Sequence, residues 1–320
     1  MTPRFDKRLP LSILLLLAGA CGSGDRSDDG RDQADADGAP PPAVYTLQDS
    51  THRVAVISGL SGPEAVRYDP DQDVYFISNF NGDGDERDSN GFISRATADG
   101  SMEVLRFMEG TEARPLHAPR GMYISGAILW VADVDGLHGF DRRSGEQVHF
   151  VDLSSFEPGF LNDVAAGPDG VLYVTDTGSR GRLYRIEGLS AELALEDSGL
   201  GPPNGITWDS DEARFLVAPW GAGGSINAWR PGSTSLEPLA EAPEGQIDGI
   251  EVVQGQIVVA SQSDRRLHIV ENGGLHPVIA VPGDPADIGV DTRRSRIAVP
   301  YIGLGRVDIW DWRPSAGEQP

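Results

Sequence analysis

A sixfold internal repeat is the feature of this 320-residue sequence that most constrains its fold. Each copy has a polar residue, a small residue, an alternating apolar stretch, a turn with Asp or Gly, and a second strand-like run. The copies are PEAVRYDPDQDVYFIS from Pro63, PRGMYISGAILWVAD from Pro119, LNDVAAGPDGVLYVTD from Leu161, PNGITWDSDEARFLVA from Pro203, IDGIEVVQGQIVVAS from Ile247 and PADIGVDTRRSRIAVP from Pro285. Their second residues are spaced by 56, 42, 42, 44 and 38 positions. Periods near 40 to 45 with short strands are typical of β-propeller blades.

Between the copies, pairs of strand-like runs are separated by Gly-containing turns, which predicts one hairpin per unit. The sixth unit is incomplete, because only the run RVDIWDWR (306–313) follows it. A spare run, HRVAVI (52–57), precedes the first unit. Pairing these two runs closes the ring and leaves no open sheet edge. The sequence therefore predicts an all-β, six-bladed propeller of four-stranded blades over residues 44–313, closed by the N-terminal strand.

The N-terminal segment has the pattern of a targeting signal. In residues 1–21, the basic residues Arg4, Lys7 and Arg8 precede an apolar run, and small residues then lead to Cys21. This resembles a bacterial lipoprotein signal peptide with a lipidated Cys21, and the alternative is a plain secretory signal with an incidental cysteine. The apolar run is shorter than the ~20 residues that a spanning helix needs. We expect an extracytoplasmic protein, in the periplasm or at the cell surface, held to a bacterial membrane by its lipid anchor only.

Composition sets the other boundaries and excludes several functions. Residues 22–43 are rich in Gly, Asp and Pro, which predicts a solvated acidic linker, and residues 314–320 are expected to form a disordered tail. The 26 Lys and Arg residues against 49 Asp and Glu residues give a net charge of −23, which argues against nucleic-acid binding. Cys21 is the single cysteine, so disulfides, cysteine-based zinc sites and thiol catalysis are excluded from the rest of the chain. No motif of a serine-triad hydrolase, a zinc protease or a nucleotide-binding loop is present.

The second residues of the six units point to a metal site. In a propeller each innermost strand begins near the central channel, so these residues face one another at one end of it. They are Glu64, Arg120, Asn162, Asn204, Asp248 and Ala286. Two carboxylates and two carboxamides supply oxygen donors only, which suits Ca²⁺ better than Zn²⁺ and better than Mg²⁺, although another divalent cation remains open. Taken alone, Asn204 or Asp248 is also explained as a turn residue, and Glu64 as a solvated loop carboxylate. The shared register of the four residues in a closed ring predicts a bound divalent cation.

These residues, with the PNG motif at 203–205 and the IDGI motif at 247–250, resemble the SMP-30/gluconolactonase/LRE-like (regucalcin-like) superfamily. That group includes diisopropyl-fluorophosphatase and is similar in design to paraoxonases, and the resemblance covers all six blades. It implies that Glu64, Asn162, Asn204 and Asp248 are the metal ligands and that Asp248 is also the nucleophile or base. It further implies a Ca²⁺-type hydrolase of lactones or organophosphate esters.

Two positions depart from the pattern of that superfamily. Arg120 stands where paraoxonases carry a histidine, and Phe160 stands where sugar-lactone hydrolases carry an arginine. Arg120 is a candidate catalytic residue that holds a substrate carboxylate or stabilises an oxyanion, and the alternative is an ion pair with Glu64 or Asp248. His117, three residues earlier, is the nearest candidate base or substrate contact, and the alternative is a solvated loop histidine.

The connections between strands at this end of the channel are expected to form the rim of a pocket. They are 79–90, 133–138, 176–180, 220–224, 261–264 and 301–304. Trp220 and Tyr301 are candidates to pack on an apolar substrate, and the alternative for both is capping of the core. The residues leave two functions open. One is a Ca²⁺-dependent hydrolase of small-molecule lactones or related esters. The other is a non-enzymatic, lipid-anchored propeller with a structural Ca²⁺ that binds a protein, peptide or glycan.

Overall fold

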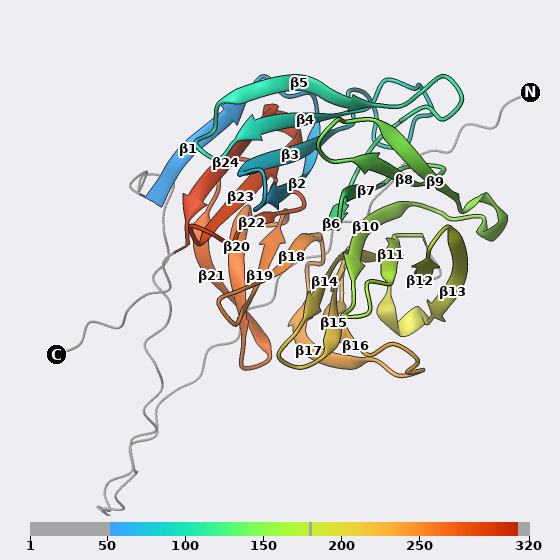
Figure 1. The fold of residues 1–320 in the computed structure, drawn as a ribbon. Helices are drawn as coiled ribbons and strands as arrows, with labels where there is room; N and C mark the ends of the chain where they lie inside the picture. The colour runs from blue at the N-terminus through green and yellow to red at the C-terminus, as the bar shows by residue number, and fades with distance from the viewer. Residues whose placement is uncertain (1–51, 179–180, 313–320) are drawn as a thin grey trace, which may run out of the picture. The chain divides into compact units, whose positions relative to one another are not determined.

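Six antiparallel four-stranded sheets make up residues 52–178 and 181–312, which are the residues that the computed structural model describes. The sheets stand around a central channel as the blades of a propeller (Figure 1). The predicted fold is therefore confirmed. The predicted signal peptide with Cys21, the linker at 22–43 and the tail at 314–320 lie outside the described residues.

Five blades are continuous in sequence, and each runs from the channel to the outside in chain order. Blade 1 consists of β2 (Pro63–Asp69), β3 (Val74–Asn79), β4 (Phe92–Thr97) and β5 (Met102–Glu109), and blade 2 of β6 (Met122–Ser125), β7 (Ile128–Ala132), β8 (Gly136–Asp141) and β9 (Gln147–Asp152). Blade 3 consists of β10 (Leu161–Ala166), β11 (Leu172–Asp176), β12 (Arg182–Glu187) and β13 (Ser190–Glu196), and blade 4 of β14 (Pro203–Asp209), β15 (Arg214–Pro219), β16 (Gly224–Trp229) and β17 (Glu237–Ala242). Blade 5 consists of β18 (Ile247–Val253), β19 (Gln256–Ser261), β20 (Arg266–Glu271) and β21 (Gly274–Ala280).

Blade 6 joins the two ends of the described chain. Its strands are β22 (Gly289–Asp291), β23 (Arg296–Tyr301), β24 (Arg306–Asp311) and, outermost, β1 (Arg53–Ser58). β1 is antiparallel to β24, with Ile57 opposite Val307. The predicted closure of the ring is confirmed, and the blue and red strands lie side by side in Figure 1.

The hydrophobic core lies between the blades. Six clusters of buried apolar side chains each combine residues of two neighbouring blades. The second strands are buried over most of their length, and β3, with the run VYFISN, is buried throughout, because both faces of each blade are covered. Outer strands such as β5 alternate less regularly and expose more of their side chains. The repeat therefore produces its own core, one interface per pair of blades.

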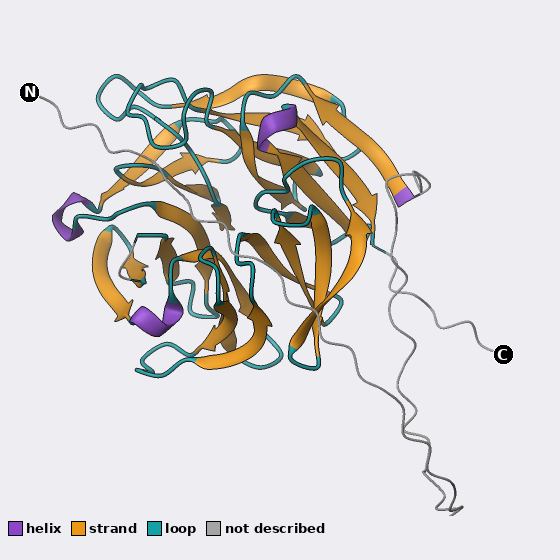
Figure 2. Cartoon of the chain, turned by 180° about the vertical axis from the view of Figure 1, so that it is seen from behind, coloured by secondary structure: helices purple, strands orange, loops and turns teal. Residues whose placement is uncertain are grey.

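Short turns and loops connect the strands, as Figure 2 shows from behind. Asn272 and Gly273 both have positive φ, as a two-residue type I′ hairpin turn between β20 and β21 requires. The 3₁₀ helices of the described chain include η2 (Ser154–Phe156), η3 (Ser198–Leu200) and η4 (Ile302–Leu304). Within the described residues, no helix has the length and apolar character needed to cross a membrane.

Truncation of Ile57 tests the closure of the ring. The Ile57 side chain is completely buried between blades 6 and 1, whereas its neighbour Val56 is 39% exposed on the same strand. We expect Ile57→Ala to lower the free energy of unfolding by about 2–4 kcal/mol, because it removes buried methylenes and leaves a cavity. Val56→Ala should cost less than about 1 kcal/mol. Urea denaturation of both variants checks this, and equal losses would contradict the placement of β1.

Candidate metal centre and central cavity

A repeated backbone irregularity positions the four predicted ligands. In β2, β10, β14 and β18 the pairing with the second strand shifts by one residue just after the first residue of the strand. Glu64, Asn162, Asn204 and Asp248 are the second residues of these strands and lie inside these bulges. A β-bulge bends the strand and re-aims a side chain. The fold therefore turns the same register position of four blades toward the channel.

Close approach of the innermost strands brings the ligand positions near one another. A Cβ atom on Gly205 would lie 2.3 Å from the carbonyl oxygen of Asp248, and one on Gly249 would lie 2.5 Å from the backbone nitrogen of Ile288. Only glycine fits at either position without a shift of the neighbouring strand. The glycines of the PNG and IDGI motifs thus serve strand packing next to each ligand.

The four predicted ligands are buried and share one property. Their side chains are 2–4% exposed. Each has one buried oxygen without a hydrogen-bond partner among the described residues: Glu64 Oε2, Asn162 Oδ1, Asn204 Oδ1 and Asp248 Oδ1. A buried polar atom without a partner costs free energy. A divalent cation that accepts oxygen ligands would satisfy all four atoms, so the residues present fit Ca²⁺.

The electrostatics of the ring also favour a cation. Burial raises the pKa of Glu64 well above its usual range, and repulsion by Asp248 adds to this, while Arg120 opposes it. Burial, with repulsion by Asp163, raises the pKa of Asp248 to about 7, although hydrogen bonds from Gln262 and Asn204 lower it. The Nε2 of Gln262 donates to Asp248 Oδ2 at 2.7 Å. The positive charge near the two ring carboxylates is therefore too small to stabilise their ionised forms, and a bound cation would supply it.

The ring opens into a cavity of about 490 Å³. Its lining consists of Glu64, Phe80, Phe160, Asn162, Thr177, Asn204, Trp220, Asp248, Gln262 and Ile302. Five of the six connections that we expected to form the rim contribute to this lining. Phe80, Thr177, Trp220, Gln262 and Ile302 each directly follow the second strand of their blade. That shared register is a signal from which the wall could have been predicted.

Three other predicted site residues do not line this cavity. Arg120 is 1% exposed and donates to the carbonyl oxygens of Leu161, at 3.0 Å, and Gly84. His117 is buried, and its Nδ1 accepts from the backbone N–H of Ser89 at 3.1 Å. Tyr301 is completely buried in the cluster between blades 5 and 6, because it ends a strand that is buried from its second residue onward.

The sequence pattern did not predict a layer of charged residues that lies below the ring. Arg67 lies three residues after Glu64, about 10 Å further along the strand. Its guanidinium is 2.9 Å from Asp287 Oδ2, 3.2 Å from Asp163 Oδ1 and 3.6 Å from Glu251 Oε1. Burial raises the pKa of all three carboxyls, that of Glu251 to about 6, and Arg67 opposes each shift. This layer links blade 1 with blades 3, 5 and 6.

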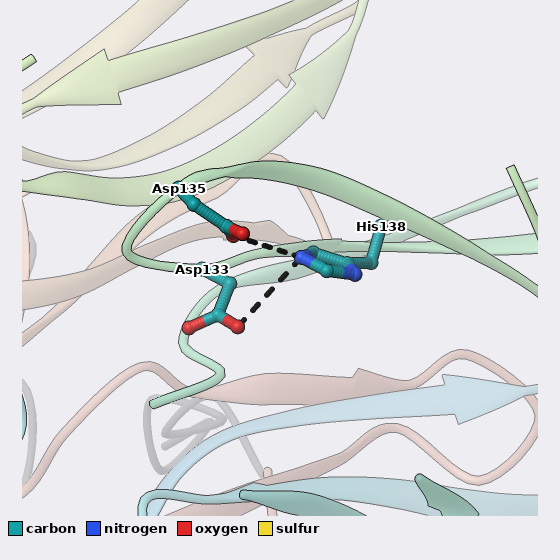
Figure 3. Close-up of side chains that lie close together, drawn as sticks. All are labelled: Asp133, Asp135 and His138. Carbon is teal, nitrogen blue, oxygen red and sulfur yellow. Dashed lines mark hydrogen bonds and ion pairs between the residues drawn. The ribbon is translucent and has the colours of Figure 1, made fainter. Parts of the chain in front are cut away.

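A second cluster of acidic and histidine side chains lies in blade 2, where Asp133, Asp135 and His138 come together (Figure 3). Their ligand atoms lie within 4.8 Å of one another, close enough to hold a metal ion. His138 is 2.7 Å from Gln147 through Nδ1 and 3.0 Å from Asp135 through Nε2. Because the Gln147 oxygen accepts from Thr111, its amide nitrogen faces His138, whose proton then sits on Nε2 and points to Asp135.

The buried carboxylate of Asp133, the third member of this cluster, is also satisfied by hydrogen bonds. Its carboxylate accepts from the backbone N–H groups of His117, at 2.6 Å, and Ala118, at 2.7 Å. Equivalent polar pairs occur in other blades between the last residue of the second strand and the third residue of the third strand. They are Asn79 with Ser94 at 3.1 Å and Asp176 with Tyr184 at 3.0 Å. We therefore interpret the blade 2 cluster as one version of a repeated polar contact within the blades.

The raised pKa of Asp248 predicts a pH-dependent stability of the metal-free protein. The folded carboxyl keeps its proton up to about pH 7, whereas an unfolded aspartate releases it near pH 4. Between these values the folded state binds more protons, so the free energy of unfolding falls as the pH rises. Melting temperatures in chelator from pH 5.5 to 8 check this. Asp248→Asn should flatten the fall, and an unchanged slope in the variant would contradict the prediction.

Comparisons with known proteins agree with this architecture. The family model described as SMP-30/Gluconolactonase/LRE-like region matches residues 90–284. A calcium-binding protein, regucalcin, from Agrobacterium tumefaciens strain C58 is 18% identical, with a TM-score of 0.59, over 84% of this chain and 95% of that chain. A gluconolactonase from Xanthomonas campestris is 17% identical, with a TM-score of 0.61, over 85% and 94%.

A third solved structure, which is less similar in sequence, is described as a lyase. Virginiamycin B lyase from Staphylococcus aureus is 14% identical, with a TM-score of 0.52, over 81% of this chain and 99% of that chain. At these identities the likeness to solved structures shows the fold alone. No curated protein sequence matches this chain significantly.

Proposed function

We propose a function from the premise that this chain belongs to the SMP-30/gluconolactonase/LRE-like family. In this proposal the protein is a Ca²⁺-dependent hydrolase of lactones or related esters, and the ring at the floor of the central cavity is its active site. One observation carries the proposal: four buried side-chain oxygens from four blades lack partners among the described residues and line one cavity.

The donor chemistry supports calcium as the cation. Glu64 and Asp248 supply carboxylate oxygens, and Asn162 and Asn204 supply carboxamide oxygens, which are ligands that Ca²⁺ prefers. The part of the lining that the structure describes contains neither histidine nor cysteine, the residues that zinc sites favour. The fold is shared with a protein described as calcium-binding and with a gluconolactonase. A Ca²⁺ ion held by these residues would polarise the carbonyl group of a bound ester as a Lewis acid.

Asp248 is the residue that moves the proton. Its Oδ2 is held by Gln262, and a cation held beside it would favour the ionised carboxylate, which is the form that acts as a base. As base, Asp248 takes a proton from a water molecule whose oxygen bonds to the carbonyl carbon. The carbon–oxygen bond of the lactone ring then breaks, and the departing alkoxide takes the proton, which gives a hydroxy acid. Direct attack by the Asp248 carboxylate is the alternative route.

A specific observation favours the second candidate, a non-enzymatic propeller with a structural Ca²⁺. Neither Arg120 nor His117 lines the cavity, so the candidate bases among the described lining residues are the two ring carboxylates, Glu64 and Asp248, which are also needed as metal ligands. In that case the cation would link four blades, and the face of the propeller would bind a protein, peptide or glycan.

Hydrolysis assays with the full-length chain separate the two candidates. A panel of lactones, aryl esters and phosphotriesters is assayed with Ca²⁺ and with chelator, and the melting temperature is measured in parallel. We expect turnover of lactones or esters that requires Ca²⁺. A flat panel together with a Ca²⁺-dependent rise in melting temperature would reject the hydrolase and favour the structural role.

A further inference from the structure

The wall of the central cavity is built largely from apolar side chains. Phe80, Phe160, Trp220 and Ile302 face the space above the ring, together with Thr177 and Gln262. Phe80 is buried, and the other three are half-buried at the open mouth. They come from the connections of blades 1, 3, 4 and 6, so they surround the ring instead of forming one patch. A substrate that reaches the ring must pass between them.

Both polar side chains of this wall already donate a hydrogen bond within the protein. The Thr177 hydroxyl donates to the Pro203 carbonyl oxygen at 2.7 Å, and Gln262 donates to Asp248. Among the described residues that line the cavity there is no arginine, lysine or histidine. A polyhydroxylated sugar lactone would therefore bury its hydroxyl groups against rings and an isoleucine, and buried hydroxyls without partners weaken binding. An alkyl or aryl group loses nothing there and gains from burial.

Arg120 lies behind two of the wall residues. Its guanidinium carbon is 3.6 Å from the centre of the Phe160 ring and 5.8 Å from that of Phe80. The same guanidinium donates to the carbonyl oxygens of Leu161, next to Phe160, and of Gly84, in the connection that follows Phe80. A Cβ atom on Gly84 would lie 3.1 Å from the Phe80 ring, so this connection packs directly on that ring. The arginine thus ties both rings to their backbone supports by cation–π contacts and hydrogen bonds.

We propose that the cavity accepts lactones or esters with a large apolar acyl group, packed against Phe80, Phe160, Trp220 and Ile302, and that Arg120 is a positioning residue for the two phenylalanine rings. This inference rests on the proposed function and names its substrate class. Phe80 and Phe160 become residues that determine specificity, and Arg120 acts through them without touching the substrate.

The first test measures the dependence of hydrolysis on chain length. With Ca²⁺ present, kcat/KM is measured for γ-butyrolactone, γ-octalactone, γ-decalactone and glucono-δ-lactone. Each buried methylene is worth up to about fourfold in binding, so we expect γ-decalactone to exceed γ-butyrolactone by at least about tenfold. Glucono-δ-lactone should be the poorest substrate. Equal or better turnover of the sugar lactone overturns the inference while leaving the proposed function intact.

Matched variants assign the effect to the wall. Phe160→Ala should reduce the preference for the long lactone by about tenfold, whereas Phe160→Leu should keep most of it. Phe156→Ala is the control, because Phe156 lies four residues earlier and packs on Tyr184, with ring centres 5.3 Å apart, outside the cavity. A chain-length preference that survives Phe160→Ala overturns the assignment of the wall.

A separate measurement tests the role of Arg120. Arg120→Met should raise KM for long lactones more than for short ones and leave kcat largely unchanged. A direct role at the oxyanion would instead lower kcat equally for all substrates. The Ca²⁺-dependent rise in melting temperature should persist in Arg120→Met, because removal of a positive charge beside Glu64 does not weaken a cation site. An equal loss of kcat for long and short lactones overturns the positioning role.

A binding assay distinguishes failure of this inference from failure of the proposed function. Non-hydrolysable lactams with and without an octyl chain are titrated while tryptophan fluorescence is recorded, with Trp220→Phe as the control that should lose the signal. Preferential binding of the octyl lactam, together with no hydrolysis of any lactone in the first test, would reject the hydrolase and keep the apolar ligand class. Equal or absent binding of the two lactams would overturn the inference.

Discussion

Asp248→Asn is expected to abolish Ca²⁺-dependent hydrolysis while the propeller stays folded. The substitution keeps the size of the side chain and an oxygen that can accept from Gln262, but it removes the group that takes the proton. Loss of a general base or nucleophile costs about 10²- to 10⁴-fold in kcat. The variant also loses one of the two ring carboxylates, so its affinity for Ca²⁺ should fall. Initial rates over a range of Ca²⁺ concentrations separate the two losses, because saturating Ca²⁺ restores metal binding without restoring the base.

Two controls keep this prediction specific. Asp284→Asn removes an exposed carboxylate, 56% accessible and paired with Arg265, and should leave rates and Ca²⁺ response unchanged. Without metal, Asp248→Asn should be at least as stable as the unsubstituted protein at pH 8, because it removes a buried charge. Full activity of Asp248→Asn at saturating Ca²⁺ would show that another group moves the proton, and the mechanism would be wrong.

Arg67→Met is expected to cause a large loss of stability. Arg67 contacts Asp163 in blade 3, Glu251 in blade 5 and Asp287 in blade 6. It also donates to the backbone carbonyls of Met122 in blade 2 and Ile288 in blade 6. Asp163 and Asp287 are each 1% exposed. Removal of one partner from a buried charge network leaves the other charges uncompensated, which costs about 3–5 kcal/mol.

The expected readout is a fall in melting temperature of roughly 10 °C, measured with Ca²⁺ and with chelator. Arg230→Met serves as the control, since Arg230 pairs with Glu237 where both side chains are about half exposed, and such a pair contributes less than about 1 kcal/mol. Adding Asp163→Asn and Asp287→Asn to Arg67→Met should recover part of the loss, because the buried charges are then gone. A melting temperature of Arg67→Met within 2 °C of the unsubstituted protein would contradict a role for Arg67 in joining the blades.

The architecture and the metal ring were predictable because both are encoded locally. Alternating apolar residues and turn residues specify each strand, and their recurrence at a fixed period specifies the blades. The ring follows from the same register, since equivalent residues of repeated units occupy equivalent positions around an axis. Residues 52–57 could be assigned to the last blade because a closed ring leaves no other partner for a spare strand.

The wall of the cavity was predictable only as a set of connections. In five blades the residue directly after the second strand lines the cavity. Whether a given side chain of such a connection faces the cavity or the core depends on how it packs against the neighbouring blade. Tyr301 and Ile302 are adjacent in sequence, yet Tyr301 is enclosed by the cluster between blades 5 and 6 while Ile302 lines the cavity. Packing against another part of the chain decides between them.

By itself, the sequence determined the six blades, their closure and the register at which four oxygen-bearing side chains meet. The tertiary structure decided which side chains reach the substrate space and which stabilise it from behind. The guanidinium of Arg120 could stabilise an oxyanion, but it lies behind the rings of Phe80 and Phe160. Arg67 occupies an ordinary strand position, and its acidic partners lie 96, 184 and 220 residues away. The physical reason is that closure of the ring brings distant blades within a few ångströms of one axis, and contacts across that axis leave no trace in local spacing.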